Sequence, residues 1–350
     1  MSDRIKGSEF PFRLRSCVWE ITLACCFRCA YCGSRGGVAR ENELSTEECL
    51  DVAEQLADLG CRRVSMIGGE VFMRPDWEQI VGALTSRGVI TCIITNGFRM
   101  TEPVIAALKR VGIESVAVSI DGVAEVHDKY RLAGSYESAM AALDVLSEAG
   151  IPVSVISALR ADNAPRLSEL YEILKTKNIF AWQIQACSPM GNAAGGSVDV
   201  GFDASEVIKF VAENAGRDPF YIGIADNIGY HTPEEAKIRG RRGLVFEGCS
   251  AGLTTLGIDS VGNVRGCESM YDERFNEGNL RERSLRDIWC DPDTFAYNRK
   301  FTPDMLAGGC AGCPKGDVCA GGCRSYNWFT TGGLYENALC PRRGINVNNE

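Results

Sequence analysis

Residues 23–37 read LACCFRCAYCGSRGG and place four cysteines, Cys25, Cys26, Cys29 and Cys32, within eight residues. A disulfide framework is not needed, because a chain of 350 residues can bury a large core without covalent links. The spacing Cys25-x3-Cys29-x2-Cys32 suits an iron–sulfur cube, which takes four ligands and receives only three from this loop. The pattern therefore predicts a metal cluster with one iron left open for chemistry.

Zinc is the alternative metal for these thiols. A structural zinc site needs a fourth cysteine or histidine near the loop, and Cys26 could take that role. The whole chain has only two histidines, His127 and His231, which are too few for a histidine-rich site. We interpret Cys26 as a packed neighbour of the three ligands.

The composition is that of a globular protein. Hydrophobic residues make up 45% of the chain and charged residues 24%, which predicts roughly two domains of about 150 residues each. The start, MSDRIKGSEFPFRLRS, lacks the apolar centre of a signal peptide, and no segment approaches the roughly 18 apolar residues of a membrane helix. Seventeen cysteines fit metal or thiol chemistry in a reducing compartment, so we expect a cytoplasmic protein with no membrane partner.

The charge gives no sign of a polyanionic partner. A formal net charge of −9 provides no general attraction to nucleic acid or anionic lipid, so no nucleic-acid partner is expected. A local basic run, RGRR at residues 239–242, is interpreted as a solvated helix face.

From residue 17 to about 187, a short β-branched run, a turn and an amphipathic helical stretch recur. Six such units predict a parallel sheet with right-handed crossovers. Because six strands are too few for a closed eight-stranded barrel, we expect a partial (β/α)6 TIM-like barrel, with a doubly wound open sheet as the alternative. A helix at 45–60 should begin with a capping box of Ser45 and Glu48 and end at Gly60. The expected strands are CVWEITL (17–23), RRVSMIG (62–68), VITCIIT (89–95), SVAVSID (115–121), PVSVISA (152–158) and AWQIQA (181–186).

The repeating strand–helix pattern ends at about residue 202. Two polar stretches, DASEVIKFVAENA and TPEEAKIRGRR, predict a helical connecting region over 203–247. Residues 248–350 hold eight of the seventeen cysteines in turns such as AGGCAGCPKGD, with too little periodic apolar sequence for a large core. Metal should supply the missing stability there. The predicted division is a barrel domain at 1–202, the connecting region at 203–247 and a cysteine-rich iron–sulfur domain at 248–350.

Three short turns follow successive predicted strands: GGE at 68–70, TNG at 95–97 and SIDG at 119–122. In parallel α/β sheets and barrels, ligands bind where strands end and helices begin. Each turn alone is ordinary. Together with the cysteine loop after the first strand, they occupy four equivalent positions, which predicts one shared ligand site.

On these residues the chain resembles the radical SAM superfamily over about residues 14–190, with Tyr31 where an aromatic residue is usual. The resemblance implies a [4Fe–4S] cluster whose open iron binds S-adenosylmethionine. It also implies cleavage of that cofactor to a 5′-deoxyadenosyl radical, which takes a hydrogen atom from the substrate. Cofactor-binding roles follow for Gly68, Gly69 and Glu70 at the methionyl amino group, for Asn96, Ser119 and Asp121 near the methionyl carboxylate and ribose, and for Arg160 at the carboxylate.

The tail resembles a SPASM domain, whose seven cysteines hold two auxiliary [4Fe–4S] clusters, so three clusters are expected in all. A pair of zinc ribbons is the alternative, disfavoured by the uneven count of seven and the lack of a nearby histidine. The resemblance implies that the first auxiliary cluster is bound by Cys249, Cys267 and Cys323, and the second by Cys310, Cys313, Cys319 and Cys340.

The first auxiliary cluster lacks a ligand that some relatives have. The gap leaves an open iron or a donor from elsewhere, including substrate, Cys187 or Cys290, although packing is the simpler interpretation of both cysteines. Glu268 directly follows Cys267, where related sulfatase-maturing enzymes place an aspartate thought to remove a substrate proton. This implies a catalytic base, with a solvated surface residue as the alternative.

The resemblance implies an oxidoreductase that modifies a ribosomally synthesised precursor peptide, with the auxiliary clusters as electron acceptors and a flavodoxin- or ferredoxin-type reductant. Only 24 residues precede Cys25, so a separate small protein is expected to recognise the leader of the peptide. The alternative is a dehydrogenase or epimerase of a sugar or aminocyclitol, which needs no such partner. A non-catalytic iron–sulfur electron carrier is a third hypothesis, but it would not need Glu70 or the SIDG turn.

Overall fold

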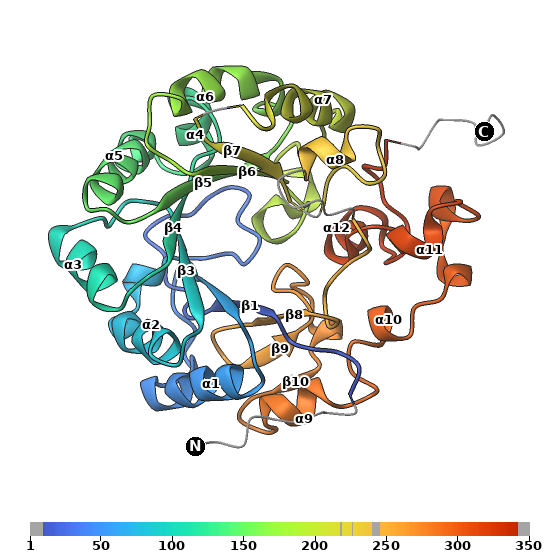
Figure 1. Cartoon of the computed structure of the whole chain (residues 1–350), viewed down its shortest axis with the longest axis horizontal. Coiled ribbons are helices and arrows are strands. Elements are labelled where there is room, and N and C mark those ends of the chain that lie inside the picture. Colours follow the sequence, from blue (N-terminus) through green and yellow to red (C-terminus); the bar gives the residue numbers. More distant parts are fainter. Residues whose placement is uncertain (1–9, 218, 226, 240–245, 342–350) are drawn as a thin grey trace.

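The computed structural model describes residues 10–217, 219–225, 227–239 and 246–341. Within them, ten strands form one sheet in the order β10-β9-β8-β1-β2-β3-β4-β5-β6-β7. The strands from β8 to β7 are all parallel, while β9 and β10 pair antiparallel at one edge. Figure 1 shows the parallel strands as an arc with helices around its outside, which is the partial barrel expected from the sequence.

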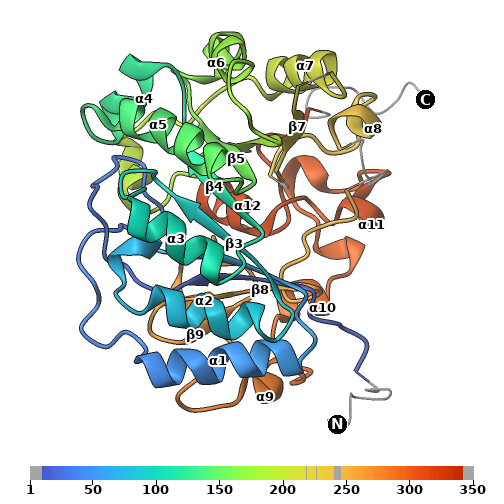
Figure 2. The ribbon, with the colours of Figure 1, turned by 60° about the vertical axis from the view of Figure 1, so that its left-hand side comes forward.

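All six predicted strands are present, each within a few residues of its expected bounds. They are β1 (Ser16–Glu20), β2 (Arg63–Ile67), β3 (Ile90–Thr95), β4 (Ser115–Ser119), β5 (Val153–Leu159) and β6 (Ala181–Ala186). The helices between them are α1 (Thr46–Asp58), α2 (Trp77–Thr85), α3 (Glu102–Arg110), α4 (Ala124–Tyr130), α5 (Ser135–Glu148) and α6 (Leu167–Leu174). Figure 2 shows α1, α2, α3 and α5 in succession along the outer face of the sheet.

Helix α1 begins as predicted. The amide of Glu48 donates to the Ser45 hydroxyl at 3.2 Å, and the Glu48 carboxylate accepts from the Ser45 amide at 2.7 Å. Gly60 follows the helix end with φ +78°, a left-handed conformation that suits glycine. The capping box therefore fixes where the chain enters the first helix after the cysteine loop.

Side chains alternate between the two faces of the sheet, as the two-residue period of a strand requires. Large buried residues such as Trp19, Met66 and Ile93 share one core with the outer helices. The opposite face, which lines the inside of the arc, carries smaller and partly exposed residues such as Ser65 and Cys92. The large apolar side chains of these strands therefore pack between the sheet and the outer helices, which holds the barrel together from its outer side.

Two further parallel strands, one at each end of the predicted six, extend the sheet beyond the prediction. Strand β7 (Tyr221–Ile224) pairs parallel with β6, so the segment 203–247 is not purely helical. Its helices are α7 (Ala204–Asn214) and the short α8 (Glu235–Ile238), while residues 240–242 of the predicted second helix and of the basic run lie outside the described residues. Strand β8 (Thr255–Ile258) pairs parallel with β1, so the cysteine-rich tail joins the sheet of the barrel.

The rest of the tail is short elements joined by turns. They are β9 (Asn263–Arg265), β10 (Gly278–Asn279), α9 (Leu285–Trp289), α10 (Ala296–Arg299), α11 (Gly316–Cys319) and α12 (Arg324–Thr331). Figure 1 shows α11 and α12 on the open side of the arc, across from β4. Within the ranges given above, no helix is long and apolar enough to cross a membrane.

Candidate functional site

The cysteine loop that follows β1 is held by two distant segments. In its middle, the amide of Ala30 donates to the carbonyl of Tyr130 at 2.8 Å. At its end, Asn192 donates from its backbone to the carbonyl of Cys32 and from its side chain to the carbonyl of Cys29, both at 2.9 Å. These bonds fix the backbone that carries two of the predicted iron ligands.

Two sulfurs of this loop accept hydrogen bonds from backbone N–H groups. Gly36 lies beside both of them: a Cβ at this position would be in ordinary contact with Cys25 and Cys32, at 3.5 Å and 3.6 Å, but only 3.1 Å from Cα of Gly69. The Gly36 amide donates to Cys32 Sγ at 3.2 Å, and the Phe27 amide to Cys25 Sγ at 3.4 Å. Burial raises the pKa of Cys29 to about 11, so iron must displace its proton. This donor set fits an iron–sulfur cluster.

The glycines of the GGE turn let the cysteine loop pass close to β2. The Gly69 amide donates to Thr22 O at 2.8 Å. A Cβ on Gly69 would lie 2.3 Å from Ala24 O and 2.4 Å from Leu23 O, and one on Gly68 would lie 2.7 Å from Thr22 O. No side chain fits at either position. The two glycines are required by the loop itself, whatever they also do at the cofactor.

Glu70 ties the end of β2 to the end of β3. Its buried carboxylate accepts from the Thr95 hydroxyl at 2.8 Å, from the Asn96 amide at 2.9 Å and from the Phe72 amide at 3.4 Å. Burial raises the pKa of Glu70 to about 7, although these donors oppose the shift. The side chain therefore has a structural role, and its predicted contact with an ammonium group stays a prediction.

Asn96 reaches the cysteine loop, as expected for a residue of the ligand site. Its Nδ2 lies 3.5 Å from Cys26 Sγ and 3.9 Å from Cys25 Sγ. Cys26 thus packs beside the predicted ligands and against β3. Ser119 ends β4 with a partly exposed side chain that makes no hydrogen bond to the rest of the described chain.

Asp121 is the centre of a buried polar network at the end of β4. One carboxylate oxygen accepts from the Tyr31 hydroxyl and from Nε of Arg131 at 2.8 Å, and the other accepts from the Ala158 amide at 3.0 Å. Burial alone would raise the pKa of Asp121, but Arg131 and Arg160 outweigh it and hold the pKa below its usual range. Asp121 is therefore ionised, and it anchors the cysteine loop through Tyr31.

Arg160 is fully buried beside this network. Its guanidinium lies between the rings of Tyr31 and Tyr130, at 4.5 Å and 4.4 Å from their centroids. Nη1 lies 3.7 Å from Asp121 and Nε lies 3.4 Å from Asp162, while Nη2 has no hydrogen-bond partner in the described part of the chain. A free donor on a buried cation suits a further anionic acceptor, which fits the role predicted for Arg160. Sequence reasoning missed Tyr130, which no motif marks.

The three cysteines predicted for the first auxiliary cluster lie within electrostatic reach of one another. Burial, together with the nearby Cys249, raises the pKa of Cys267 to about 11. Burial and Cys249 likewise raise the pKa of Cys323. Such thiols are protonated at neutral pH without metal, and a shared metal cluster removes their mutual repulsion.

Cys187 and Cys290, the two cysteines considered as further donors to the first auxiliary cluster, pack against other parts of the chain. Cys187 packs in a small cluster with Tyr31 and Ala193, on the radical-site side of the barrel. Cys290 follows α9 and packs against the main core. These contacts favour the interpretation of both as packed residues.

The four cysteines predicted for the second auxiliary cluster line one cavity of about 80 Å³. A single water needs only about 10–15 Å³, so the cavity has room for a larger group. The Asn337 amide donates to Cys310 Sγ at 3.4 Å, another N–H···S bond of the kind found at cluster ligands. No three cysteine, histidine or carboxylate side chains among the described residues are close enough to bind one metal ion. The proposed ligand sets are therefore supported by the shared cavity and the electrostatic interactions of the cysteines, and not by metal-binding distances.

Glu268 is 5% exposed, so the alternative of a solvated residue is wrong. Its Oε1 lies 3.6 Å from Nη1 of Arg265, and neither carboxylate oxygen accepts a hydrogen bond within the described chain. Burial and the charge of Glu20 raise the pKa of Glu268 well above its usual value. Glu20 is fully buried, pairs with Arg40 at 2.5 Å and keeps its Oε2 without a partner. Sequence reasoning missed Glu20, although an acidic residue inside an apolar strand was a signal.

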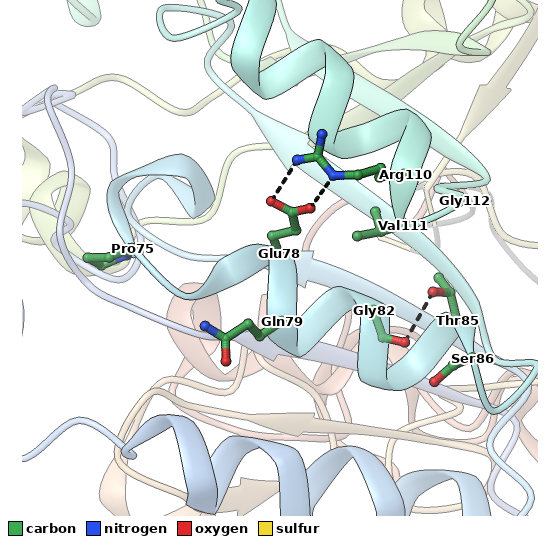
Figure 3. A pocket seen from close by; sticks show the side chains of 9 residues that line it. All are labelled: Pro75, Glu78, Gln79, Gly82, Thr85, Ser86, Arg110, Val111 and Gly112. Carbon is green, nitrogen blue, oxygen red and sulfur yellow. Dashed lines mark hydrogen bonds and ion pairs between the residues drawn. The ribbon is translucent and has the colours of Figure 1, made fainter.

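A broad surface hollow of about 750 Å³ lies between α2 and α3 on the outer side of the barrel (Figure 3). Glu78 and Arg110 face each other across it and form a two-fold ion pair at 2.8 Å and 3.1 Å. None of the predicted site residues lines this hollow. We therefore assign it no part in the site.

Comparison with protein families agrees with this geometry. A family model described as the radical SAM superfamily matches residues 19–174. A second, described as the SPASM iron–sulfur cluster-binding domain, matches residues 249–314.

Individual relatives match over most of the chain. The mycofactocin maturase MftC of Mycolicibacterium smegmatis is 30% identical over 331 residues, which cover 93% of this chain and 81% of MftC. An AdoMet-dependent heme synthase of Methanosarcina barkeri is 27% identical over 344 residues, which cover 94% of this chain and 97% of that protein. Streptococcus suis SuiB bound to S-adenosylmethionine shares the fold with a TM-score of 0.76 at 17% identity, covering 95% of this chain and 78% of SuiB.

Proposed function

Because the chain belongs to the radical SAM superfamily and carries a SPASM domain, we propose that it oxidises a ribosomally synthesised precursor peptide. Its cofactors are S-adenosylmethionine and [4Fe–4S] clusters. S-adenosylmethionine supplies the 5′-deoxyadenosyl radical that takes a hydrogen atom from the substrate, and the auxiliary clusters accept the electron left behind. The observation that carries the peptide substrate is the likeness to the maturase MftC over 93% of the chain. SuiB, which shares the fold, has also been solved with its precursor peptide SuiA.

The site residues take the following proposed roles. Cys25, Cys29 and Cys32 hold the cluster that binds S-adenosylmethionine, and the buried Arg160, whose Nη2 has no partner among the described residues, binds the carboxylate of that cofactor. The other cofactor contacts are Tyr31, Gly68, Gly69, Glu70, Asn96, Ser119 and Asp121. The auxiliary clusters are held by Cys249, Cys267 and Cys323, and by Cys310, Cys313, Cys319 and Cys340. The barrel domain at 1–202, the connecting region at 203–247 and the SPASM domain at 248–350 remain the proposed division.

Glu268 is the proposed proton acceptor. Oxidation of a C–H bond removes a proton as well as electrons, and a buried carboxylate with unpartnered oxygens is suited to receive it. Glu268 directly follows the proposed ligand Cys267 in the chain and lies within electrostatic reach of Glu20. Arg265, whose Nη1 lies 3.6 Å from Oε1 of Glu268, would balance the negative charge of the Glu268 carboxylate until that carboxylate accepts a proton.

The proposal includes two protein partners: a one-electron reductant of the flavodoxin or ferredoxin type, and a separate small protein that recognises the leader of the peptide. It also places the enzyme in the cytoplasm. The free state of all seventeen cysteines supports a reducing compartment.

A tetrapyrrole is the second candidate substrate, because the heme synthase relative matches over 97% of its own length. The sugar or aminocyclitol alternative is not favoured by these relatives. The two candidates can be separated by one assay of the anaerobically reconstituted enzyme with S-adenosylmethionine and reductant. Peptides encoded beside its gene are compared with iron coproporphyrin III as substrates, and 5′-deoxyadenosine and substrate mass are measured.

We expect 5′-deoxyadenosine above the substrate-free background together with a peptide lighter by hydrogen atoms. Conversion of the porphyrin while every peptide stays unchanged would replace the first candidate by the second. A matched control without reductant should give neither product.

A further inference from the structure

His231 lies in the wall of the cavity that the four cysteines of the second auxiliary set line, outside every motif of the sequence analysis. Its side chain is only 11% exposed, and its Nε2 is buried without a hydrogen-bond partner in the described part of the chain. Leaving a buried polar atom unsatisfied destabilises the folded state. A group that the cavity receives would remove this destabilisation.

The ring of His231 is held from its other edge. Glu235 Oε2 accepts from the backbone amide of His231 at 2.8 Å and lies 3.7 Å from Nδ1. Glu235 is itself held by Arg239, whose Nε lies 3.3 Å from Oε1. Because 3.7 Å is too long for a hydrogen bond, Nδ1 does not need the ring proton, and Nε2, on the edge left for the cavity, can carry it as a donor.

The backbone at His231 gives independent support. Its φ of +50° lies in the left-handed region, which residues with side chains seldom adopt. Such conformations cluster at ligand sites, where the surrounding structure imposes them to direct a side chain.

A [4Fe–4S] cluster has four irons, and the cavity already offers Cys310, Cys313, Cys319 and Cys340, so a fifth ligand is surplus. Hydrogen bonding is the role that remains. We propose that His231 donates a hydrogen bond from Nε2 to the second auxiliary cluster and thereby raises its reduction potential. Hydrogen bonds to cluster sulfurs stabilise the more negative, reduced state. This inference rests on the cysteine ligands assigned under the proposed function.

The test compares His231→Phe, which keeps a ring but has no N–H, with His231→Gln, which keeps a donor. Each reconstituted holoenzyme is titrated with a redox mediator series while its electron paramagnetic resonance signals are followed. At a fixed solution potential near the wild-type midpoint, His231→Phe should lower the reduced-to-oxidised ratio of one cluster by about three- to tenfold. His231→Gln should restore part of this ratio, and the other two clusters should titrate unchanged.

Cys319→Ala shows which signal belongs to the second auxiliary cluster. If that variant loses no signal, the ligand assignment is wrong, whatever His231 does. If it loses one signal and this same signal titrates as wild type in His231→Phe, the inference about His231 alone is overturned. Should His231→Phe fail to load iron, His231→Leu takes its place; loss of the cluster in His231→Gln as well would make His231 a scaffold residue and refute the inference.

Discussion

The phenolic hydroxyl of Tyr31 donates to the buried carboxylate of Asp121, which joins the cysteine loop to the end of β4 across 90 residues of sequence. The same carboxylate oxygen accepts from Arg131, and the ring of Tyr31 stacks on Arg160. The aromatic residue before Cys32 is therefore part of a buried ionic network. Its hydroxyl and its ring have separate partners, which allows them to be tested separately.

Tyr31→Phe removes the hydroxyl and keeps the ring. The free energy of unfolding should fall by about 1–3 kcal/mol, because a buried carboxylate loses one donor. Urea unfolding followed by circular dichroism measures the loss. Tyr221→Phe is the matched control, since the hydroxyl of Tyr221 has no hydrogen bond to any described residue, and its effect should stay within about 0.5 kcal/mol. Equal losses in the two variants would show that the bond to Asp121 contributes nothing specific.

Gly69→Ala should displace the cysteine loop, because the new Cβ would lie 2.3 Å from the backbone oxygen of Ala24. Iron content after anaerobic reconstitution should fall by about four irons per chain, the content of one cluster. Gly82→Ala is the control: inside α2 its Cβ meets Val111 at an ordinary 3.8 Å, and the helix should gain about 0.5–1 kcal/mol. A Gly69→Ala protein with full iron and wild-type thermal stability would contradict the close approach.

Short-range patterns predicted much of this molecule. The six central strands and the capping box of α1 depend on spacings within a few residues, where periodicity and capping geometry act directly. Ser45 and Glu48 bond as their spacing predicts, and Cys310, Cys313 and Cys319 share a cavity with the more distant Cys340.

What the sequence did not predict depends on contacts between distant segments. Strands β7 and β8 have four residues each, too few for a periodic signal, and they are stabilised by pairing with β6 and β1. Glu20 on β1 and Glu268 after β9 are far apart in the sequence but come within electrostatic reach of each other in the fold. The GGE glycines were predicted for a ligand, whereas the contact that excludes a side chain at Gly69 is with the chain's own loop.

His127 should make stability depend on pH. Its ring is buried, and Nδ1 accepts from the Asp121 amide at 3.3 Å, which requires an unprotonated nitrogen. Burial, with a contribution from Arg131, lowers the pKa of His127 to about 4. The unfolded chain, with a histidine pKa near about 6.5, binds a proton that the folded chain rejects. This stabilisation amounts to at most about 3 kcal/mol of the free energy of unfolding. It is complete above about pH 6.5 and is lost as the pH falls toward about 4.

His127→Asn keeps an acceptor near Nδ1 but does not titrate. Unfolding free energies of the wild type and the variant, measured between about pH 7 and pH 4, should converge as the pH falls. All other titrating groups are common to both proteins. Parallel curves over this range would rule out a depressed pKa at His127.

Cys25→Ala, Cys29→Ala and Cys32→Ala should each abolish reductive cleavage of S-adenosylmethionine, because the open iron is lost with its cluster. About eight of about twelve irons should remain, since the auxiliary ligands lie on a separate segment. Cys26→Ala is the neighbouring control and should retain cleavage. The readouts are 5′-deoxyadenosine, iron and acid-labile sulfide. Continued cleavage in all three variants, or stoichiometric zinc without iron, would end the assignment.

The gap in the first auxiliary ligand set has its own test. Cys187→Ala and Cys290→Ala should leave the iron content and the resonance signal of that cluster unchanged, because both cysteines pack elsewhere. Addition of substrate should perturb the same signal if the open position receives it. A cluster lost from either variant would identify that cysteine as the missing ligand.

Glu268→Gln addresses the chemistry. The amide keeps the shape of the side chain but cannot take a proton, so turnover should fall by roughly two to four orders of magnitude. Iron content and cleavage of S-adenosylmethionine should stay at wild-type levels, because a base acts after the hydrogen atom has been removed. The exposed Glu273→Gln, a few residues away, is the matched control and should turn over normally. If Glu268→Gln loses about four irons, the carboxylate is the missing ligand of the first auxiliary cluster. If it keeps both its iron and its turnover, the base must be sought elsewhere, and the buried Glu20 with its unpartnered oxygen is the next residue to replace.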